Sequence, residues 1–226
     1  LLVRPARAEA LRRDGLRITS PFGDATLHPR VVTQATPADA VLLACKAWDL
    51  DAAMEAIAPA MAGGACLVPV LNGMAHLAPL EARFPGRVLG GLAKIQATLA
   101  PDGAVRHLND WRWLTFGELD GGMSPRAEAL AAAFAGAKGV VAQAVPDIRQ
   151  RMWEKLVHLG SAAIGTVLLR ADVGAIVRAG GTALLHRVLA RNAAIAAHHG
   201  HPMTDAFLAE YRALFADSGS AYATSM

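Results

Sequence analysis

Apolar residues along the chain alternate between short continuous runs and longer stretches in which they recur every three or four positions. The runs at 40–45 and 65–71 are too short for helices and predict strands buried on both faces. The stretches at 50–61 and 75–83 predict helices, and 88–99 predicts a third strand. This order of strand, helix, strand, helix, strand is typical of a parallel α/β sheet with right-handed crossovers.

Shorter elements flank this alternating region. Turn residues such as Gly15 and Phe22-Gly23-Asp24 mark their ends. The further elements expected before residue 146 are strand 1–3, helix 8–13, a hairpin of strands 16–20 and 25–29, a short strand 31–32, antiparallel strand pieces in 103–119, helix 125–137 and strand 138–144.

After Pro146 the pattern is helical throughout, with helices predicted at 147–169, 173–200 and 203–216. We therefore predict an α/β, Rossmann-like dinucleotide-binding domain over 1–145, followed by an all-α C-terminal domain over 146–226. The chain begins in mid-strand and ends in mid-pattern. We thus expect the first strand and glycine loop of the first domain to be missing, and the helical domain to be incomplete.

Composition narrows the function classes. The chain has 226 residues, of which 54% are hydrophobic, enough for one large domain or two modest ones with real cores. A net charge of +3, an aromatic content of 5% and no run of basic residues argue against a nucleic-acid-binding surface. Both cysteines, Cys45 and Cys66, lie in apolar runs and are interpreted as buried free thiols. With no transmembrane span, we expect a cytoplasmic protein without membrane partners.

Three polar residues stand where predicted strands end: Arg4, Lys46 and Asn72. In open parallel sheets, ligands bind beyond the carboxyl ends of the strands, so these residues are candidates for one binding edge. Each also has a plain alternative: a surface charge for Arg4, a snorkelling side chain for Lys46, and a tight turn for Asn72-Gly73.

Arg4 has a more specific possible role. In a dinucleotide fold the residue that ends the second strand faces the adenosine ribose, and an arginine there accommodates the 2′-phosphate of NADP. The planar guanidinium fork matches phosphate geometry. Together with Arg7, Arg4 favours NADP as the cofactor.

Lys155 stands out because the chain uses lysine sparingly. Only four of its 22 basic residues are lysines: Lys46, Lys94, Lys138 and Lys155. A partly buried lysine, unlike an arginine, can shift its pKa and transfer a proton. Lys155 follows a tryptophan at the opening of a mostly apolar helix; an ordinary helix-surface lysine is the alternative.

Several short motifs carry a resemblance to a known family. They are Leu2-Val3-Arg4, Leu11 with Gly15-Leu16, Ala44-Cys45-Lys46-Ala47-Trp48, Pro69-Val70-Leu71-Asn72-Gly73, Gly90-Gly91, Gly117-Glu118-Leu119, Trp153-Glu154-Lys155-Leu156 and Thr224-Ser225-Met226. In this order and rough spacing they resemble the ketopantoate reductase (2-dehydropantoate 2-reductase) family over essentially the whole chain.

The resemblance implies an NADPH-dependent oxidoreductase that reduces 2-dehydropantoate to pantoate in pantothenate and coenzyme A biosynthesis. Lys155 matches the lysine that donates a proton to the carbonyl oxygen. Asn72 matches an asparagine near the nicotinamide and substrate, and Lys46 a lysine that contacts the cofactor. Ser225 matches a serine that reaches the substrate carboxylate region. The partner expected is a small 2-keto acid, and a homodimer is possible.

The sequence departs from the family at one helix face. Leu159 and Ala163 stand where the best-known members have substrate-binding asparagines. His158 is a partial substitute or, as the alternative, a structural histidine. Two other functions therefore stay open: a paralogous reductase of another 2-keto acid, and a dinucleotide-binding module without catalysis.

No metal is expected. Histidines 198, 199 and 201 are clustered, but adjacent histidines on a helix point about 100° apart, and no cysteine or carboxylate stands at ligand spacing. They are interpreted as the end of a helix.

Overall fold

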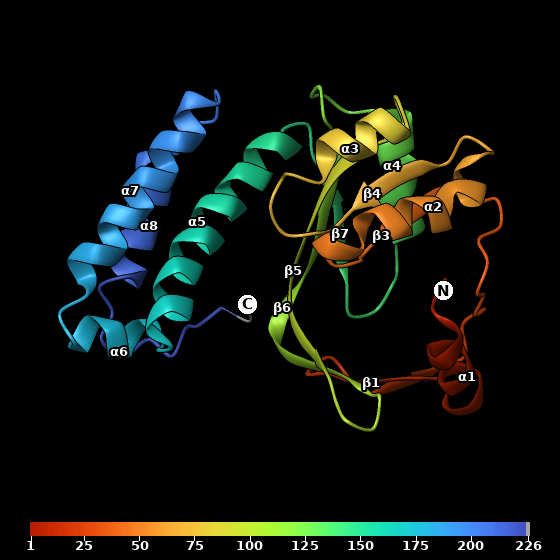
Figure 1. Cartoon of the computed structure of the whole chain (residues 1–226), viewed down its shortest axis with the longest axis horizontal. Helices are drawn as coiled ribbons and strands as arrows, with labels where there is room; N and C mark the ends of the chain where they lie inside the picture. The colour runs from red at the N-terminus through yellow and green to blue at the C-terminus, as the bar shows by residue number, and fades with distance from the viewer. Residues whose placement is uncertain (225–226) are drawn as a thin grey trace. The chain divides into compact units, whose positions relative to one another are not determined.

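The protein, described by a computed structural model over residues 1–224, divides into two compact units, Leu1–Ile148 and Arg149–Met226. The first unit combines strands and helices (Figure 1). Its elements are α1 (Pro5–Asp14), β1 (Leu16–Thr19), β2 (Ala25–Leu27), β3 (Ala40–Leu43), the 3-10 turn η1 (Ala47–Asp49), α2 (Leu50–Met61), β4 (Cys66–Pro69), α3 (Leu77–Arg83), β5 (Leu89–Leu99), β6 (Val105–Glu118), α4 (Pro125–Ala133) and β7 (Val141–Ala144).

The long strand β6 holds the larger sheet together. It pairs antiparallel with β5 along one edge, and parallel with β7 and β1 along the other. β1 forms an antiparallel hairpin with β2, as predicted. The expected strand pieces in 103–119 are thus one continuous 14-residue strand. Figure 1 shows β5 and β6 as a long ribbon that reaches β1.

The alternating region folds as its pattern predicts. β3 and β4 pair in parallel, with Leu43 opposite Pro69, and α2 connects them. β4 in turn meets the start of β5 through a parallel bridge between Leu67 and Val88. A Cβ on Gly91 would lie 2.5 Å from the Pro69 carbonyl oxygen, so glycine permits the close approach of the two backbones.

The core of the first unit lies where this sheet meets α4. Cys66 and Val68 of β4 pack with Leu89, Leu114 and Phe116 of β5 and β6. Leu130, Ala131 and Phe134 pack against this cluster from the α4 side. The helix begins at the cap residue Ser124, whose hydroxyl accepts the Ala127 N–H at 3.3 Å.

Helices are the secondary structure of the second unit over the residues described, and turns and loops connect them. Its elements are α5 (Ile148–Leu169, which starts at the last residue of the first unit), α6 (Val173–Arg178), α7 (Thr182–His198) and α8 (Asp205–Leu214). Val157, Ile176, Leu185, Leu189 and Phe215 are central to its buried core.

The prediction of a single helix over 173–200 is wrong. The chain breaks between α6 and α7, where Gly180 takes φ +84°, a conformation that favours glycine. Gly181 then packs so close to Ile176 that an added Cβ would lie 2.4 Å from its side chain. Hydrophobic periodicity continues through this corner and therefore conceals it.

Two smaller expectations also need correction. The strands expected at 1–3 and 31–32 are reduced to one parallel bridge between Leu2 and Val32. Both cysteines are free, but only Cys66 is buried, whereas Cys45 is half-buried. With these changes, the α/β unit followed by helices confirms the predicted class, a Rossmann-like domain and an all-α C-terminal region.

Candidate functional site

Lys46, Asn72 and Lys94 lie at one level of the sheet, where Lys46 and Asn72 follow β3 and β4 and Lys94 is a residue of β5. Leu43 and Pro69 are paired in register, and Gly91 lies against the Pro69 carbonyl. Each of the three polar residues stands three positions beyond this level in its own strand or loop. Because β3 and β4 are parallel and β4 meets β5 through a parallel bridge, the three segments continue toward the same end of the sheet. We call Lys46, Asn72 and Lys94 the rim residues.

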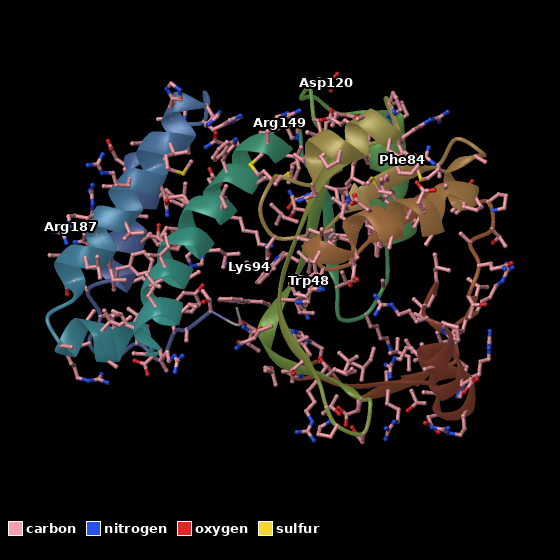
Figure 2. The ribbon with its side chains drawn as sticks, in the orientation of Figure 1. Trp48, Phe84, Lys94, Asp120, Arg149 and Arg187 are labelled. Atoms are coloured by element: carbon pink, nitrogen blue, oxygen red, sulfur yellow. The ribbon has the colours of Figure 1, made fainter. Side chains whose placement is uncertain are left out.

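The rim side chains are available to a ligand. All three residues are exposed, and within residues 1–224 none of their side chains has a hydrogen bond or an ion pair with the protein. Trp48, on the turn after Lys46, is 81% exposed (Figure 2). Exposed polar groups at this end of the parallel strands suit the binding of an anionic or hydrogen-bonding ligand. The structure places the predicted Lys46 and Asn72 on this edge.

Arg4 lies close to the same segment. It caps the N-terminus of α1, just after the Leu2–Val32 bridge, and its guanidinium lies 3.0 Å from the Asp49 carboxylate. Asp49 ends the turn that follows Lys46, so the ion pair joins the Arg4 and Lys46 segments. The Arg4 side chain remains 82% exposed, which leaves it able to bind a second anion.

Arg7 differs from Arg4 in its surroundings. Its guanidinium donates to the carbonyl oxygen of Gly103 at 3.2 Å, and so links α1 to the turn between β5 and β6. Its position supports a structural role, whereas Arg4 keeps the exposure that phosphate recognition needs.

Lys155 lies on α5 in the second unit and is half-buried. Burial lowers the pKa of its ammonium from the ordinary lysine value to about 8. Trp153, two residues earlier, stacks on His199 and His201 with ring centroids 5.1 and 5.9 Å apart. This packing fixes the helix turn that carries Lys155. An amine with a pKa near neutrality is suited to donate a proton.

Aromatic rings enclose the neighbouring histidine. The His158 imidazole stacks on Tyr211 at 4.3 Å and on Tyr222 at 5.5 Å between centroids. Burial raises the pKa of Tyr211 to about 12 and also raises that of Tyr222. Both phenols therefore stay protonated near neutral pH. This packing favours the structural interpretation of His158.

The remaining predicted site residue, Ser225, lies outside the described residues. Its neighbour Thr224 lies against α5, where the Thr224 and Thr166 hydroxyl oxygens are 2.9 Å apart. The Thr166 hydroxyl is also 2.9 Å from the Ala162 carbonyl oxygen, to which it donates.

One cation on the rim had no role assigned from sequence. Lys94 contacts two tryptophan rings, with Nζ 4.9 Å from the Trp111 centroid and 5.6 Å from that of Trp113. Lys94 and Trp113 are direct partners across β5 and β6. Alternation along the hairpin was the only local signal, because Trp111 and Trp113 follow Lys94 by 17 and 19 positions and meet it only after the strands pair.

Other site types are not supported. Residues 1–224 contain no group of three or more His, Cys, Asp or Glu side chains arranged to hold a metal ion. Over the same residues, no helix has the length and apolar character that crossing a membrane requires.

Comparisons with known proteins give consistent results. Residues 1–121 match the family model described as ketopantoate reductase PanE/ApbA, and residues 147–226 match its C-terminal model. An uncharacterized oxidoreductase of Bacillus subtilis, YkpB, is 33% identical over 178 residues, which is 77% of this chain and 58% of that protein. A 2-dehydropantoate 2-reductase of Archaeoglobus fulgidus is 32% identical over 177 residues, or 78% of this chain and 58% of that protein. The chain thus spans less than two thirds of the length of these relatives.

Solved structures extend the similarity to the whole chain. A putative ketopantoate reductase from Ralstonia solanacearum superposes with a TM-score of 0.85 at 29% identity, covering 100% of this chain and 76% of that one. A 2-dehydropantoate 2-reductase from Geobacter metallireducens gives 0.87 at 27% identity, with the same coverage. Because the family models match segments in both units, the chain belongs to the ketopantoate reductase family.

Proposed function

We propose that this protein reduces 2-dehydropantoate to pantoate with NADPH, and that Lys155 is the proton donor. The observation that carries the proposal is the half-buried Lys155, whose pKa lies near 8, within the Trp-Glu-Lys-Leu motif of a chain that belongs to this family. A lysine that is protonated at neutral pH but releases its proton readily meets the requirement for a general acid.

The exposed residues of the first unit fit a nicotinamide dinucleotide. Arg4 offers an exposed guanidinium, Lys46 an ammonium and Asn72 an amide, all without hydrogen-bond partners among the described residues except for the Arg4–Asp49 pair. We propose that Arg4 binds the 2′-phosphate, that Lys46 contacts the cofactor, and that Asn72 binds near the nicotinamide and the substrate. When bound, the reduced cofactor supplies the hydride for the substrate carbon.

The chain's own residues perform the remaining steps. The Lys155 ammonium donates its proton to the carbonyl oxygen, which would otherwise carry a full negative charge in the product. The neutral amine then recovers a proton from solvent. Ser225, by its match to the family motif, is proposed to bind in the substrate carboxylate region.

The roles of the two units follow from the same proposal. The N-terminal domain binds NADP, and the C-terminal helices present the general acid. The pathway would be pantothenate biosynthesis, and a cytoplasmic location agrees with the two free thiols, Cys45 and Cys66. A homodimer stays a prediction.

A second candidate is a paralogous reductase of another 2-keto acid. The observation that favours it is the apolar pair Leu159 and Ala163, one and two turns beyond Lys155 on α5. Neither position offers a polar side chain to a substrate hydroxyl group. A 2-keto acid that lacks a hydroxyl group would therefore lose less binding affinity than 2-dehydropantoate.

A substrate panel with NADPH tests both candidates. We expect the highest kcat/KM with 2-dehydropantoate, compared with 2-oxoisovalerate, pyruvate and phenylglyoxylate. A panel in which one of the other acids ranks first supports the paralogue. NADPH binding without turnover of any of these acids would contradict both reductase functions.

A further inference from the structure

The ammonium of Lys94, a residue labelled in Figure 2, lies against the indole rings of Trp111 and Trp113 on the β5–β6 ribbon. Strand pairing places Lys94 opposite Trp113, and the ring distance places Trp111, two residues earlier on β6, beside the same ammonium. A cation within about 6 Å of a tryptophan ring is attracted by the negative face of the ring. Both centroid distances fall within this range.

The platform beneath Lys94 is held by hydrogen bonds of the backbone. The Trp111 N–H donates to Asn109 Oδ1 at 3.1 Å, and the Trp111 carbonyl accepts from His107 Nε2 at 2.7 Å. Asn109 also donates to Gln96 Oε1 at 3.2 Å across the hairpin. The position of Trp111 is thus set before any ligand arrives, which lowers the entropy cost of binding.

A register shift follows Lys94 directly. The pairing of β5 with β6 is interrupted between Ile95 and Ala97. Here one residue of β5, Gln96, stands opposite residues 108–111 of β6, and an irregularity in a ladder bends a strand and re-aims its side chains. Here the shift separates the regular pairing that carries Lys94 and Trp113 from the outer part of the hairpin.

Within residues 1–224, Lys94 has no carboxylate partner, and the rings engage its charge without accepting a conventional hydrogen bond. The nearby cation Arg112 pairs with Ile95 and so lies on the opposite face, where its guanidinium is 3.8 Å from the Phe22 centroid. The ammonium donors of Lys94 therefore remain available to an anion.

The position of Lys94 links it to the proposed reaction. Lys94 lies within β5 at the same level as Lys46 and Asn72, as described for the rim. Trp113 is 37% exposed and offers an apolar ring surface beside the ammonium. A 2-keto acid carries both matching parts: a carboxylate for the ammonium and a hydrocarbon chain for the ring.

We propose that Lys94, Trp111 and Trp113 form a site in the first unit that binds the carboxylate of the substrate, in addition to the contact proposed above for Ser225. The Lys94 Nζ–H groups donate to the carboxylate oxygens, and the carbon chain of the substrate rests on the indole of Trp113. This inference rests on the proposed function, because it takes a 2-keto acid as the substrate and assigns its carboxylate to the rim residue Lys94. The alternative is that Lys94 only covers the tryptophans.

A comparison of an acid with its ester separates these two roles. The probes are 2-oxoisovalerate and its uncharged methyl ester, and their dissociation constants are measured from tryptophan fluorescence of the protein with NADP present. The variants are Lys94→Gln and Lys94→Arg, and Lys138→Gln is the control, since Lys138 is also an exposed lysine of the first unit.

For Lys94→Gln we expect a rise of roughly ten- to a hundredfold in the Kd of the acid, and less than a threefold change for the ester. Lys94→Arg should restore most of the affinity, and Lys138→Gln should bind like the wild type. Equal changes for acid and ester, or no change for the acid, would overturn the carboxylate site.

The same titrations distinguish this proposal from the proposed function. A normal binding response of the acid without any turnover would contradict the reductase function while leaving the carboxylate site intact. Full turnover in Lys94→Gln with an unchanged KM for the acid would overturn the site alone.

Discussion

At the residue scale, the proposed chemistry depends on a lysine whose surroundings make it a better acid than lysine in water. Burial on α5 disfavours the charged form of Lys155 and lowers its pKa to about 8. The ammonium still predominates at neutral pH, so the group is charged when it is needed and gives up its proton at moderate cost. An arginine at this position would stay charged and could not act in this way.

This shift predicts the pH dependence of the reaction. The fraction of protonated Lys155 falls as pH rises through about 8, so kcat/KM for reduction should fall tenfold per pH unit above that value. A pH–rate profile from pH 6 to 10 measures the descending limb. In Lys155→Arg this limb should be absent from the residual activity. A wild-type profile that stays flat to pH 9.5 would show that Lys155 is not the acid.

Asp49 is expected to tune the cofactor preference through Arg4. Its carboxylate lies 3.0 Å from the Arg4 guanidinium. The carboxylate therefore competes with a 2′-phosphate for the guanidinium, and its negative charge repels the phosphate. For an exposed pair of this kind the effect is modest, and Asp49→Asn should lower the KM for NADPH about two- to fivefold, with no matching gain for NADH.

Initial-rate measurements with both cofactors check this prediction. Asp51→Asn is the matched control, because it removes the same charge from an exposed position two residues away. Equal shifts for NADPH and NADH in Asp49→Asn would contradict the assignment of Arg4 to the 2′-phosphate.

At the scale of elements, glycines at close backbone contacts determine how the sheet packs. Gly117 of β6 is an example, since an added Cβ would lie 2.1 Å from the Val145 carbonyl oxygen and 3.2 Å from the Ile148 side chain. The first contact is with backbone, which cannot rotate away. The Gly117-Glu118 motif noted in the sequence therefore has a structural reason as well as a family resemblance.

Gly117→Ala should destabilise the first unit. Overpacking of a core costs roughly 1–3 kcal/mol, and a contact with rigid backbone places this variant at the upper end. Gly63→Ala is the matched control, because Gly63 is exposed and the nearest atom to its Cβ would be Pro37 Cβ at 3.9 Å. Urea unfolding of both variants gives the comparison. A loss below about 0.5 kcal/mol for Gly117→Ala would contradict this packing.

Most elements could be predicted because their signals are local. The helix over Leu50–Met61 was predicted with the bounds that the structure shows, since its periodicity ends at a pair of glycines. The corner at Gly180 was missed because apolar periodicity continues across it. The single length of β6 was missed because tryptophans and charged residues interrupt its alternation, and its pairing partners are distant in sequence.

At the scale of the whole molecule, the candidate site also contains residues with local sequence signals and residues whose surroundings depend on distant segments. Lys46 and Asn72 could be placed on one edge from sequence because each ends an apolar run, and the strands before them are in register. Lys94 could not, since its surroundings depend on the pairing of β5 with β6 and on the register shift that follows. The family resemblance is confirmed by the family models, whereas the roles of the individual residues stay predictions.

Lys155 is proposed to donate the proton in the reduction of a 2-keto acid. The most direct test of this role compares the wild type with Lys155→Ala in the reduction of 2-dehydropantoate by NADPH, with Lys138→Ala as the control for loss of a lysine elsewhere. We expect a fall in kcat of about 10²- to 10⁴-fold in Lys155→Ala with KM within about threefold, and no effect in the control. A loss of less than about tenfold in Lys155→Ala would contradict this role.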